Sequence, residues 1–511
     1  MAQETSGSSV RRRGRPSAEL VDATPLSGSA VDVGVRIGWL LKMARLADPA
    51  AAARQQRDMV DRLAAIGVRT SVSSLSRLEA GQRVSNDLVE GYETVLRLRP
   101  GRLRGPIDAL LRTHGGEPIE RRRPGPPSLE EWSVCHARVS VGEPRGIDWL
   151  HFADMMAAPG MLGLPIDLAG PKVERLAREM SRSVQVAHLL RYEALAQLRC
   201  SQYSALVLDV IRQIVEDPGT QVLYDLMAVL AEHPTDTLLA WCGRLLTSDA
   251  QHVVRAGVIA IESMRQNGGA VDWSLIEAPL AEAYNGGEEW RRALLSHAFR
   301  VLPPRVRSTL LPQLAHPIAE VRQPMDWTPS RRNLHYNLCL DLANEVTQRL
   351  GLDPQPILAR LLFEALYDFR ETRRGNALNF LAALPFQEEL ADAMLKASAH
   401  EDGTTREGAV LAIAGLSHPV YVDTARSWVR TDERELQTAG LTVLAHAADH
   451  IVPDRMRELV LEPYPVGRLA MYAVGMCADP LVVELALDPD VPDHVRKAAR
   501  WWLGNGSRVT S

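Results

Sequence analysis

Apolar residues recur at helical spacing in five short segments near the beginning of the chain. The first segment, about 33–46, carries apolar side chains three or four residues apart, which is typical of an amphipathic helix. An alanine-rich stretch follows, and a second helix is predicted over roughly 57–66 before a break at Gly67. The pattern therefore predicts helices from the beginning of this region.

Capping residues mark the third and fourth helices. In "SVSSLSRLEAGQRVSNDLVEGYETVL", Ser71 can cap a short helix that ends at Gly81, because glycine readily adopts positive φ. Ser85 caps the next helix, which runs until Pro100, and a fifth helix ends near residue 113. Five short helices joined by tight turns predict a compact bundle over 32–113.

This segment resembles the helix-turn-helix of the XRE, or lambda-repressor-like, family. A serine-rich recognition helix, Ser-Arg-Leu-Glu, a small residue, Gly, a polar pair and a capped helix form that family's usual run, which residues 71–98 match. The resemblance extends over about 33–113 and implies binding to duplex DNA. The sequence departs from the family in a longer spacer between the first two helices. It also lacks the usual Ser/Thr-Gln at the second helix, although Gln55 and Gln56 lie nearby.

Helix geometry indicates which side chains would face DNA. If Val72, Leu75 and Leu78 tether the third helix, the opposite face can reach base edges in the major groove. Val72 lies at the edge of this set and could instead touch a thymine methyl. Arg77 suits guanine because its planar fork matches two acceptors, whereas the capping serine and the free amides suit phosphate. The alternative is that the serines are only surface caps and that Arg77 pairs with an acid such as Glu79. The predicted major-groove and phosphate contacts are Ser71, Val72, Ser73, Ser74, Arg77, Gln82 and Arg83.

Basic residues are concentrated in the first part of the chain. Residues 1–124 carry 21 Lys and Arg against 14 Asp and Glu, the remainder carries 37 against 49, and the whole chain has a net charge of −5. A basic head on an acidic body is expected when one end binds DNA. In "SVRRRGRPSAE", Arg13 and Arg15 flank a glycine and resemble an AT-hook core, which lies in a narrow minor groove. The alternative is that 1–31 is a disordered basic arm that adds only nonspecific affinity.

Helical patterning repeats along the rest of the chain, beyond a Pro-, Gly- and Arg-rich linker at 114–130. Several segments combine an acidic or proline-containing turn with small residues in an apolar helix, such as "EDGTTREGAVLAIAGL" and "DPDVPDHVRKAARWWLG". A period near 30 residues built from two helices is typical of an α-solenoid. Steps of 30, 32 and 28 residues separate the equivalent positions Gly408, Thr438, Ala470 and Ala498.

These units resemble HEAT repeats over 399–504 and around 248–264, which implies a solenoid that we assign to 246–504. An arginine at the start of each second helix is expected to form a ladder with an acid of a neighbouring turn. Residues 131–245 have vaguer periods and fit HEAT-like repeats, TPR-like repeats or a plain bundle. Segment 324–337 is a candidate partner-binding loop, or else an irregular connection between repeats. Its candidate contacts are residue types favoured at interfaces: Trp327, Arg331, Arg332 and Tyr336.

Sequence motifs for catalysis or metal binding do not stand out. Five scattered cysteines without a CxxC pair favour a reducing compartment. The sequence has no P-loop, GxSxG or HExxH motif and no apolar run of about 18 residues or more. His446 and His450 lack a third ligand and are assigned to a helix surface. We therefore expect no cofactor, no metal, no enzymatic activity and a cytoplasmic location.

Together these features predict an all-α protein in which a small helix-turn-helix bundle precedes an α-solenoid and a short tail at 505–511. The expected function is that of a bacterial-type, sequence-specific transcriptional regulator. Its repeats would mediate partner binding, sensing or oligomerisation, for example as a homodimer. The alternative is a nucleoid-associated or defence-related scaffold, in which the solenoid binds a protein and DNA binding only localises it.

Overall fold

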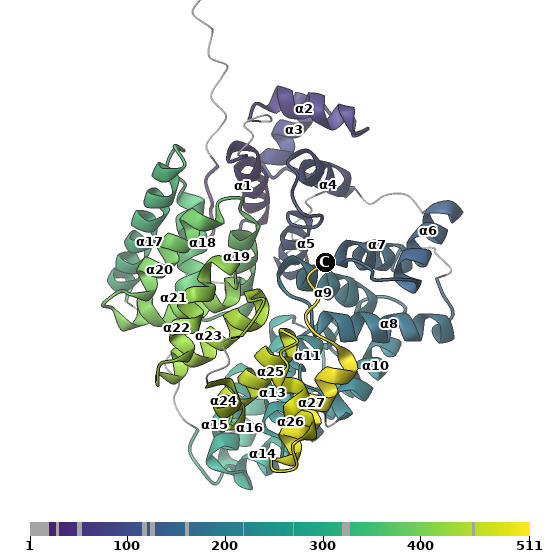
Figure 1. Cartoon of the computed structure of the whole chain (residues 1–511), viewed down its shortest axis with the longest axis vertical. Coiled ribbons are helices and arrows are strands. Elements are labelled where there is room, and N and C mark those ends of the chain that lie inside the picture. The colour runs from purple at the N-terminus through teal and green to yellow at the C-terminus, as the bar shows by residue number, and fades with distance from the viewer. Residues whose placement is uncertain are drawn as a thin grey trace, which may run out of the picture.

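Helices build nearly all of the protein that the structure describes. The computed structural model describes residues 20–26, 30–48, 54–114, 120–122, 128–158, 163–217, 219–268, 270–318, 328–451 and 455–511. The helices form an N-terminal bundle and two arms of paired helices, and Figure 1 shows the bundle between the upper ends of the two arms.

The N-terminal bundle contains five helices near the predicted positions. The fourth ends at Val95, before the predicted stop at Pro100, and Ser85 precedes it without a side-chain capping hydrogen bond. The bounds are α1 (Val33–Leu46), α2 (Gln56–Ala65), α3 (Val72–Glu79), α4 (Asn86–Val95) and α5 (Arg104–His114). Two short parallel strands, β1 (Arg83–Ser85) and β2 (Glu120–Arg122), were not expected. The segment 114–130 is therefore not only a linker, because part of it pairs with the backbone that follows α3.

The first arm follows the bundle and has its own hydrophobic core. A row of helices in which α7 contacts α9, α9 contacts α11, α11 contacts α13 and α13 contacts α15 runs through the arm. Its elements are α6 (Leu129–Ser140), α7 (Gly146–Met156), α8 (Ile166–Met180), α9 (Gln185–Arg199), α10 (Ser204–Glu216), α11 (Tyr224–Leu230), α12 (Asp236–Leu245), α13 (Gln251–Gln266), η1 (Trp273–Ile276), α14 (Glu277–Asn285), α15 (Glu289–Val301), α16 (Pro304–Leu310) and η2 (Leu311–Gln313).

The second arm contains the most regular helix pairs. Its elements are α17 (Pro329–Arg349), α18 (Pro356–Tyr367), α19 (Glu371–Ala383), α20 (Gln387–Ser398), α21 (Gly403–Leu416), η4 (Pro419–Tyr421), α22 (Val422–Val429), α23 (Arg434–Ala447), α24 (Met456–Leu461), α25 (Val466–Met476), α26 (Leu481–Leu487) and α27 (Asp493–Asn505). The predicted equivalent positions all fall in the second helix of a pair. Here Gly408 allows a close approach, because a Cβ at this residue would lie 2.0 Å from the carbonyl oxygen of Leu366.

The repeat region differs from one continuous solenoid over 246–504. The core of the first arm extends from α6 to α16, and the core of the second arm from α17 to α27. The boundary predicted at 245/246 lies inside the first arm, where α12 and α13 pack together. The structure is thus a helical-repeat protein with two arms.

Contacts between the arms replace the predicted arginine ladder at two of its positions. Arg255 donates to the hydroxyl of Tyr464 at 3.0 Å, and Tyr224 lies 3.1 Å from the same hydroxyl. Arg468 donates to the main-chain oxygen of Gln221 at 2.5 Å. These arginines were expected to pair with acids of neighbouring turns. They instead join α11, α13 and the loop after α10 to the α24–α25 region.

The C-terminal residues connect the two arms and are not a loose tail. The amide of Val509 donates to the oxygen of Arg182 at 2.9 Å, and the amide of Val184 donates back to Val509 at 3.2 Å. Arg508 donates through its amide to Met476 at 3.1 Å. The predicted tail at 505–511 therefore belongs to the fold.

The N-terminal bundle shares its hydrophobic core with the second arm. The guanidinium of buried Arg36 donates to both oxygens of the buried Glu364 carboxylate, each at 2.7 Å. Asp22 lies 3.1 Å from Arg36, and Leu20 packs against the shared core. The predicted arm at 1–31 therefore extends too far, since residues 20–26 lie against the folded protein. On the other side of the bundle, α5 contacts α9 of the first arm.

One carboxyl group, on Glu262, should make the free energy of unfolding depend on pH. Burial, together with nearby Glu371, raises the pKa of Glu262 to about 7. Between about pH 4.5 and 7 the folded protein holds a proton that the unfolded chain has lost, so stability falls as pH rises, by at most about 3 kcal/mol. Above pH 7 this group causes no further loss.

Urea unfolding of Glu262→Gln at pH 5 and pH 8 measures this effect. We expect the variant to lose less stability than the unmodified protein between these two values, because the amide does not titrate. Exposed Glu407→Gln is the control and should behave like the unmodified protein. Equal losses in all three proteins would contradict the prediction.

Candidate nucleic-acid interface

The carboxylate of Glu79 holds α3 in the bundle. Arg45 of α1 donates to Glu79 at 2.5 and 2.8 Å, and the amide of Gln56 donates to it at 2.8 Å. Tyr92 of α4 donates its hydroxyl at 2.8 Å. Burial beside Glu79 raises the pKa of Tyr92 well above its usual value, so this hydroxyl keeps its proton. One buried acid thus connects α3 to three other helices.

The alternative in which Arg77 pairs with Glu79 is not what the structure shows. Both carboxylate oxygens of Glu79 face the inside of the bundle and accept from Arg45 and Tyr92. Sequence reasoning also missed the role of Gln56. This residue is the first of α2, and its amide contacts Glu79. Gln55 and Gln56 are adjacent, so the sequence alone did not indicate which of them would face the bundle.

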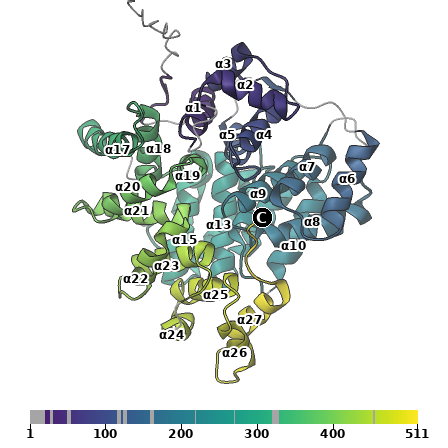
Figure 2. The same ribbon diagram turned by 45° about the horizontal axis from the view of Figure 1, so that its top comes forward.

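The outer face of α3 is open to solvent. Leu75 and Leu78 are buried beneath the helix, whereas Ser73, Ser76 and Arg77 are exposed. Figure 1 and Figure 2 show α2 and α3 at the end of the molecule opposite the C-terminal helices α26 and α27. No part of the two arms is drawn over this end in either view. A large partner can therefore approach α3 from outside the molecule.

The predicted contact residues lie along this face and its edges. Ser71 caps α3, because its Oγ accepts from the amide of Ser74 at 3.1 Å. Val72 is 45% exposed and lies at the beginning of the helix, as expected for an edge position. Ser74 is only half-buried and lies 3.0 Å from the Ser71 hydroxyl. Ser76 was not among the predicted contacts, although it shares the exposed face.

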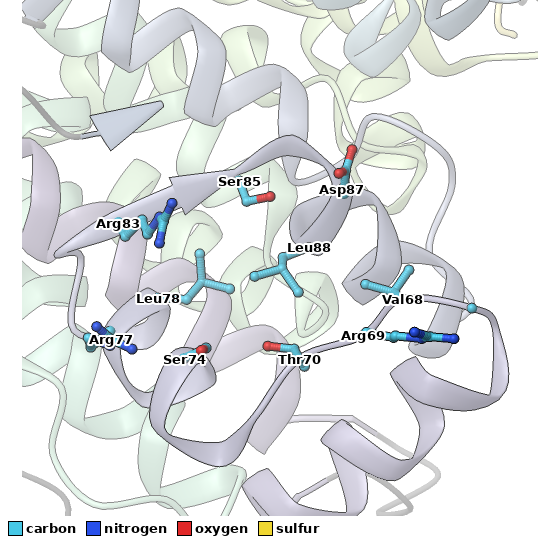
Figure 3. Close-up of a pocket in the computed structure, with 11 residues that line it drawn as sticks. Val68, Arg69, Thr70, Ser74, Arg77, Leu78, Arg83, Ser85, Asp87 and Leu88 are labelled. Atoms are coloured by element: carbon cyan, nitrogen blue, oxygen red, sulfur yellow. The ribbon is translucent and has the colours of Figure 1, made fainter. Parts of the chain in front are cut away.

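A hollow of about 360 Å³ opens between α3, β1 and the beginning of α4. Three arginines line it: Arg69 before α3, Arg77 within α3 and Arg83 in β1. Figure 3 shows Ser74 and Thr70 between Arg77 and Arg69. One acid, Asp87, also lines the hollow, so the balance is basic. The guanidinium groups and hydroxyls are the groups that proteins use to contact phosphate.

Gln82 and Arg83 follow α3 directly, and both are exposed. The parallel strand β2 pairs Glu120 with Arg83 and Arg122 with Ser85 in the backbone register. Arg13 and Arg15 of the predicted minor-groove arm lie outside the described residues. The structure therefore places the predicted contacts from Ser71 to Arg83 near one another, and a DNA-binding role for them and for the arm stays a prediction.

The predicted partner-binding loop is a helix over most of its described part. Residues 329–337 belong to α17, and Arg331 and Arg332 lie in its first turn. The ring of Tyr336 packs edge-on against Phe363 at 6.0 Å. The aromatic and basic side chains that suggested a loop thus recur here on a helix. Trp327 lies outside the described residues.

Neither a metal-binding cluster nor a single membrane-spanning helix is found in the described part of the chain. No cluster of three or more His, Cys, Asp or Glu side chains suited to a metal occurs there. His446 was assigned to a helix surface, but burial lowers its pKa to about 4 and it lies 3.0 Å from the Tyr472 hydroxyl. No single described helix is long and apolar enough to cross a membrane. Only α25 and α26 pass that test as a pair, and they are bent by 119°.

Comparisons with known proteins do not place the chain in a family. No protein-family model and no curated protein matches it. A structure of microtubule polymerases with tumor overexpressed gene domain arrays is 10% identical and covers 81% of this chain and 100% of that chain, with a TM-score of 0.26. A designed armadillo repeat protein for modular peptide recognition is 11% identical over 61% and 98%, with a TM-score of 0.14. An engineered protein is 12% identical over 92% and 98%, with a TM-score of 0.19. Likenesses at these scores support no argument about partners.

Removing the Glu79 carboxylate should loosen α3. In Glu79→Ala, the buried Arg45 guanidinium loses its partner, and breaking a buried ion pair in this way costs about 3–5 kcal/mol. We expect faster hydrogen exchange of the α3 amides and a lower unfolding midpoint in urea. Exposed Glu407→Ala should change stability by less than about 0.5 kcal/mol. Unchanged α3 exchange in Glu79→Ala would show that the carboxylate does not hold the helix.

Proposed function

We propose that the protein binds duplex DNA through the exposed face of α3 and that its two arms contact a protein partner. The observation that carries this proposal is the contrast between the two faces of α3. The inner face is fixed by Leu75, Leu78 and Glu79, whereas Ser73, Ser76 and Arg77 are exposed at one end of the molecule. A fixed, exposed, polar helix of this size fits the major groove.

Each exposed group has a distinct role in this proposal. Arg77 contacts a guanine, since its guanidinium offers paired donors to two acceptors on that base. Arg69 and Arg83, on either side of the hollow, contact phosphates and set the register of the protein on the duplex. Ser73 and Ser76 contact neighbouring base edges. The residues thus divide into base-reading and backbone-binding groups.

The contacts between the bundle and the second arm support a scaffold role for the arms. The core shared with the second arm and the ion pair of Arg36 with Glu364 make the bundle part of one body. In this proposal the protein is a cytoplasmic, nucleoid-associated scaffold without catalytic activity, and DNA binding localises its protein partner. The second candidate is a sequence-specific regulator, which the serine- and arginine-bearing face of α3 favours.

Genome-wide mapping of the bound protein separates the two candidates. A few promoter sites would support the regulator, whereas broad coverage would support the scaffold. Because a single helix-turn-helix buries little surface, either role needs a second copy or further contacts for tight binding.

Replacing Arg77 should weaken and relax DNA recognition. We expect Arg77→Ala to lower the affinity for a duplex selected from a random pool by about 5- to 150-fold, since one good base contact contributes about 1–3 kcal/mol. The preference at one base pair should be lost at the same time. Fluorescence anisotropy with the full chain measures both effects. The full chain is required because the bundle core includes the second arm.

The matched control is Arg406→Ala, which removes an exposed arginine from α21 of the second arm. Its affinity should stay within twofold of the unmodified protein. If both variants bind equally well, α3 is not the DNA-reading helix. If the unmodified protein binds no duplex at low salt, the proposal of DNA binding is wrong.

Deleting residues 1–19 tests the predicted basic arm separately. The deletion removes four arginines, Arg11, Arg12, Arg13 and Arg15. Each phosphate contact that is lost should reduce the slope of log affinity against log salt by about 0.9. Anisotropy titrations at several salt concentrations give this slope. An unchanged slope would mean that the arm does not contact the duplex.

A further inference from the structure

A cavity of about 470 Å³ lies where the bundle and the two arms meet. The bundle contributes Arg99 and Pro100 from the loop between α4 and α5. The first arm contributes the beginnings of α7 and α9, and the second arm contributes the end of α23. The C-terminal residues 510–511 complete the wall. A molecule in this cavity would touch all three parts of the protein.

The cavity wall is basic. Arg99, Arg145 and Arg508 line it, and Asp449 carries the one acidic side chain in the lining. Arg145 is also paired with Asp148, which lies behind the lining, at 3.1 Å. Asp449 lies 3.7 Å from Arg508 and is itself almost fully exposed, so its charge is largely screened by water. The fifth group that could carry a charge, His446, is neutral at pH 7 because burial lowers its pKa to about 4. The lining therefore carries a positive balance.

Two helices begin at this cavity and add to its positive potential. Gly146 is the first residue of α7, and Gln185 is the first residue of α9. Helix N-termini present free amides and the positive end of the helix dipole. The amide of Gly146 donates to the main-chain oxygen of Ser511 at 3.2 Å, so at α7 an oxygen atom of the chain itself already accepts from the helix N-terminus. Arg191 donates to the same oxygen at 2.7 Å.

Backbone strain coincides with the same site. Gln185 is not a glycine, yet its φ is 52°, in the left-handed region. Its side-chain amide donates to the oxygen of Ser417 at 3.0 Å and so bridges the two arms beside the cavity. Strained residues of this kind are retained where the surrounding structure fixes them, and they cluster at binding sites.

The rest of the cavity is apolar. Ile147 and Leu190 of the first arm, and Pro100 and Pro419 from the other two parts, provide hydrocarbon surface. Ligand sites combine apolar lining with a few charged groups, in volumes of about 300–1,000 Å³. We propose that this cavity binds a small organic anion, a carboxylate or phosphate ester attached to an apolar group. The arginines and helix N-termini hold the anionic group, and the apolar wall holds the rest.

Calorimetric titration of the full chain, without DNA, tests the site with three probes. Phenyl phosphate combines both features, inorganic phosphate lacks the apolar ring and benzyl alcohol lacks the charge. We expect phenyl phosphate to bind with one-to-one stoichiometry and to raise the melting temperature, because it bridges three parts of the fold. Each of the other two probes should bind at least about tenfold more weakly. Equal binding by benzyl alcohol, or no binding by phenyl phosphate, would overturn the proposal.

Three variants locate the site. Arg99→Ala should weaken phenyl phosphate binding by about threefold or more, since Arg99 is exposed and its charge is partly screened. Arg97→Ala in the same loop is the control, because Arg97 is exposed and does not line the cavity. Val186→Trp should abolish binding by filling the space. If Val186→Trp does not fold, the comparison of Arg99→Ala with Arg97→Ala decides the result.

A last variant separates this cavity from the candidate DNA interface, where phosphate also has basic partners. Arg77→Ala changes the hollow beside α3 and should leave phenyl phosphate binding unchanged. Loss of binding in Arg77→Ala together with normal binding in Arg99→Ala would place the ligand at α3 and overturn the proposal. Because no duplex is present, failure of DNA binding would not affect the outcome.

Discussion

The buried carboxylate of Glu364 joins the N-terminal bundle to the second arm, and the orientation of the bundle depends on it. Arg36 donates two hydrogen bonds to it from α1, and Arg373 donates a third at 2.6 Å from α19. Removing one partner would leave a buried charge uncompensated, at a cost of about 3–5 kcal/mol. Farther along α1, Arg45 binds Glu79 and so fixes α3. Arg36 and Arg45 both belong to α1. Through their buried acidic partners, Glu364 and Glu79, α1 connects the second arm to the exposed helix α3.

Local sequence signals predicted where α3 begins and ends, because they act over a few residues. Ser71 caps the beginning of α3, and Gly81 follows its end with a positive φ. Both features can be predicted from the sequence without knowing the fold. The acceptor of Arg45 was not readable, since arginine has many acids to choose from along the chain. The same limitation applies to Tyr336: its residue type suggested an exposed contact, but its packing against Phe363 depends on a helix pair that forms around it.

The repeats show where sequence periodicity stops being informative. Their period reflects how one helix packs on the next, as at Gly408, so spacing alone reveals it. The division into two arms and their contacts involve residues that are far apart. Arg255 and Tyr464, for example, are separated by 209 positions. No local pattern indicates such a pairing. The small strand pair was missed because each strand is only three residues long, which is too short to give a strand signal.

The separation between Arg36 and Glu364 has a consequence for the order of events during synthesis. The two residues are 328 positions apart, so a nascent chain emerges with its first helices long before their acidic partner exists. Contacts this distant in sequence slow folding, and large proteins pass through incomplete intermediates. An interrupted translation product would therefore carry a bundle with bare apolar surface. The ribosome must finish most of the polypeptide before α3 can take its final orientation.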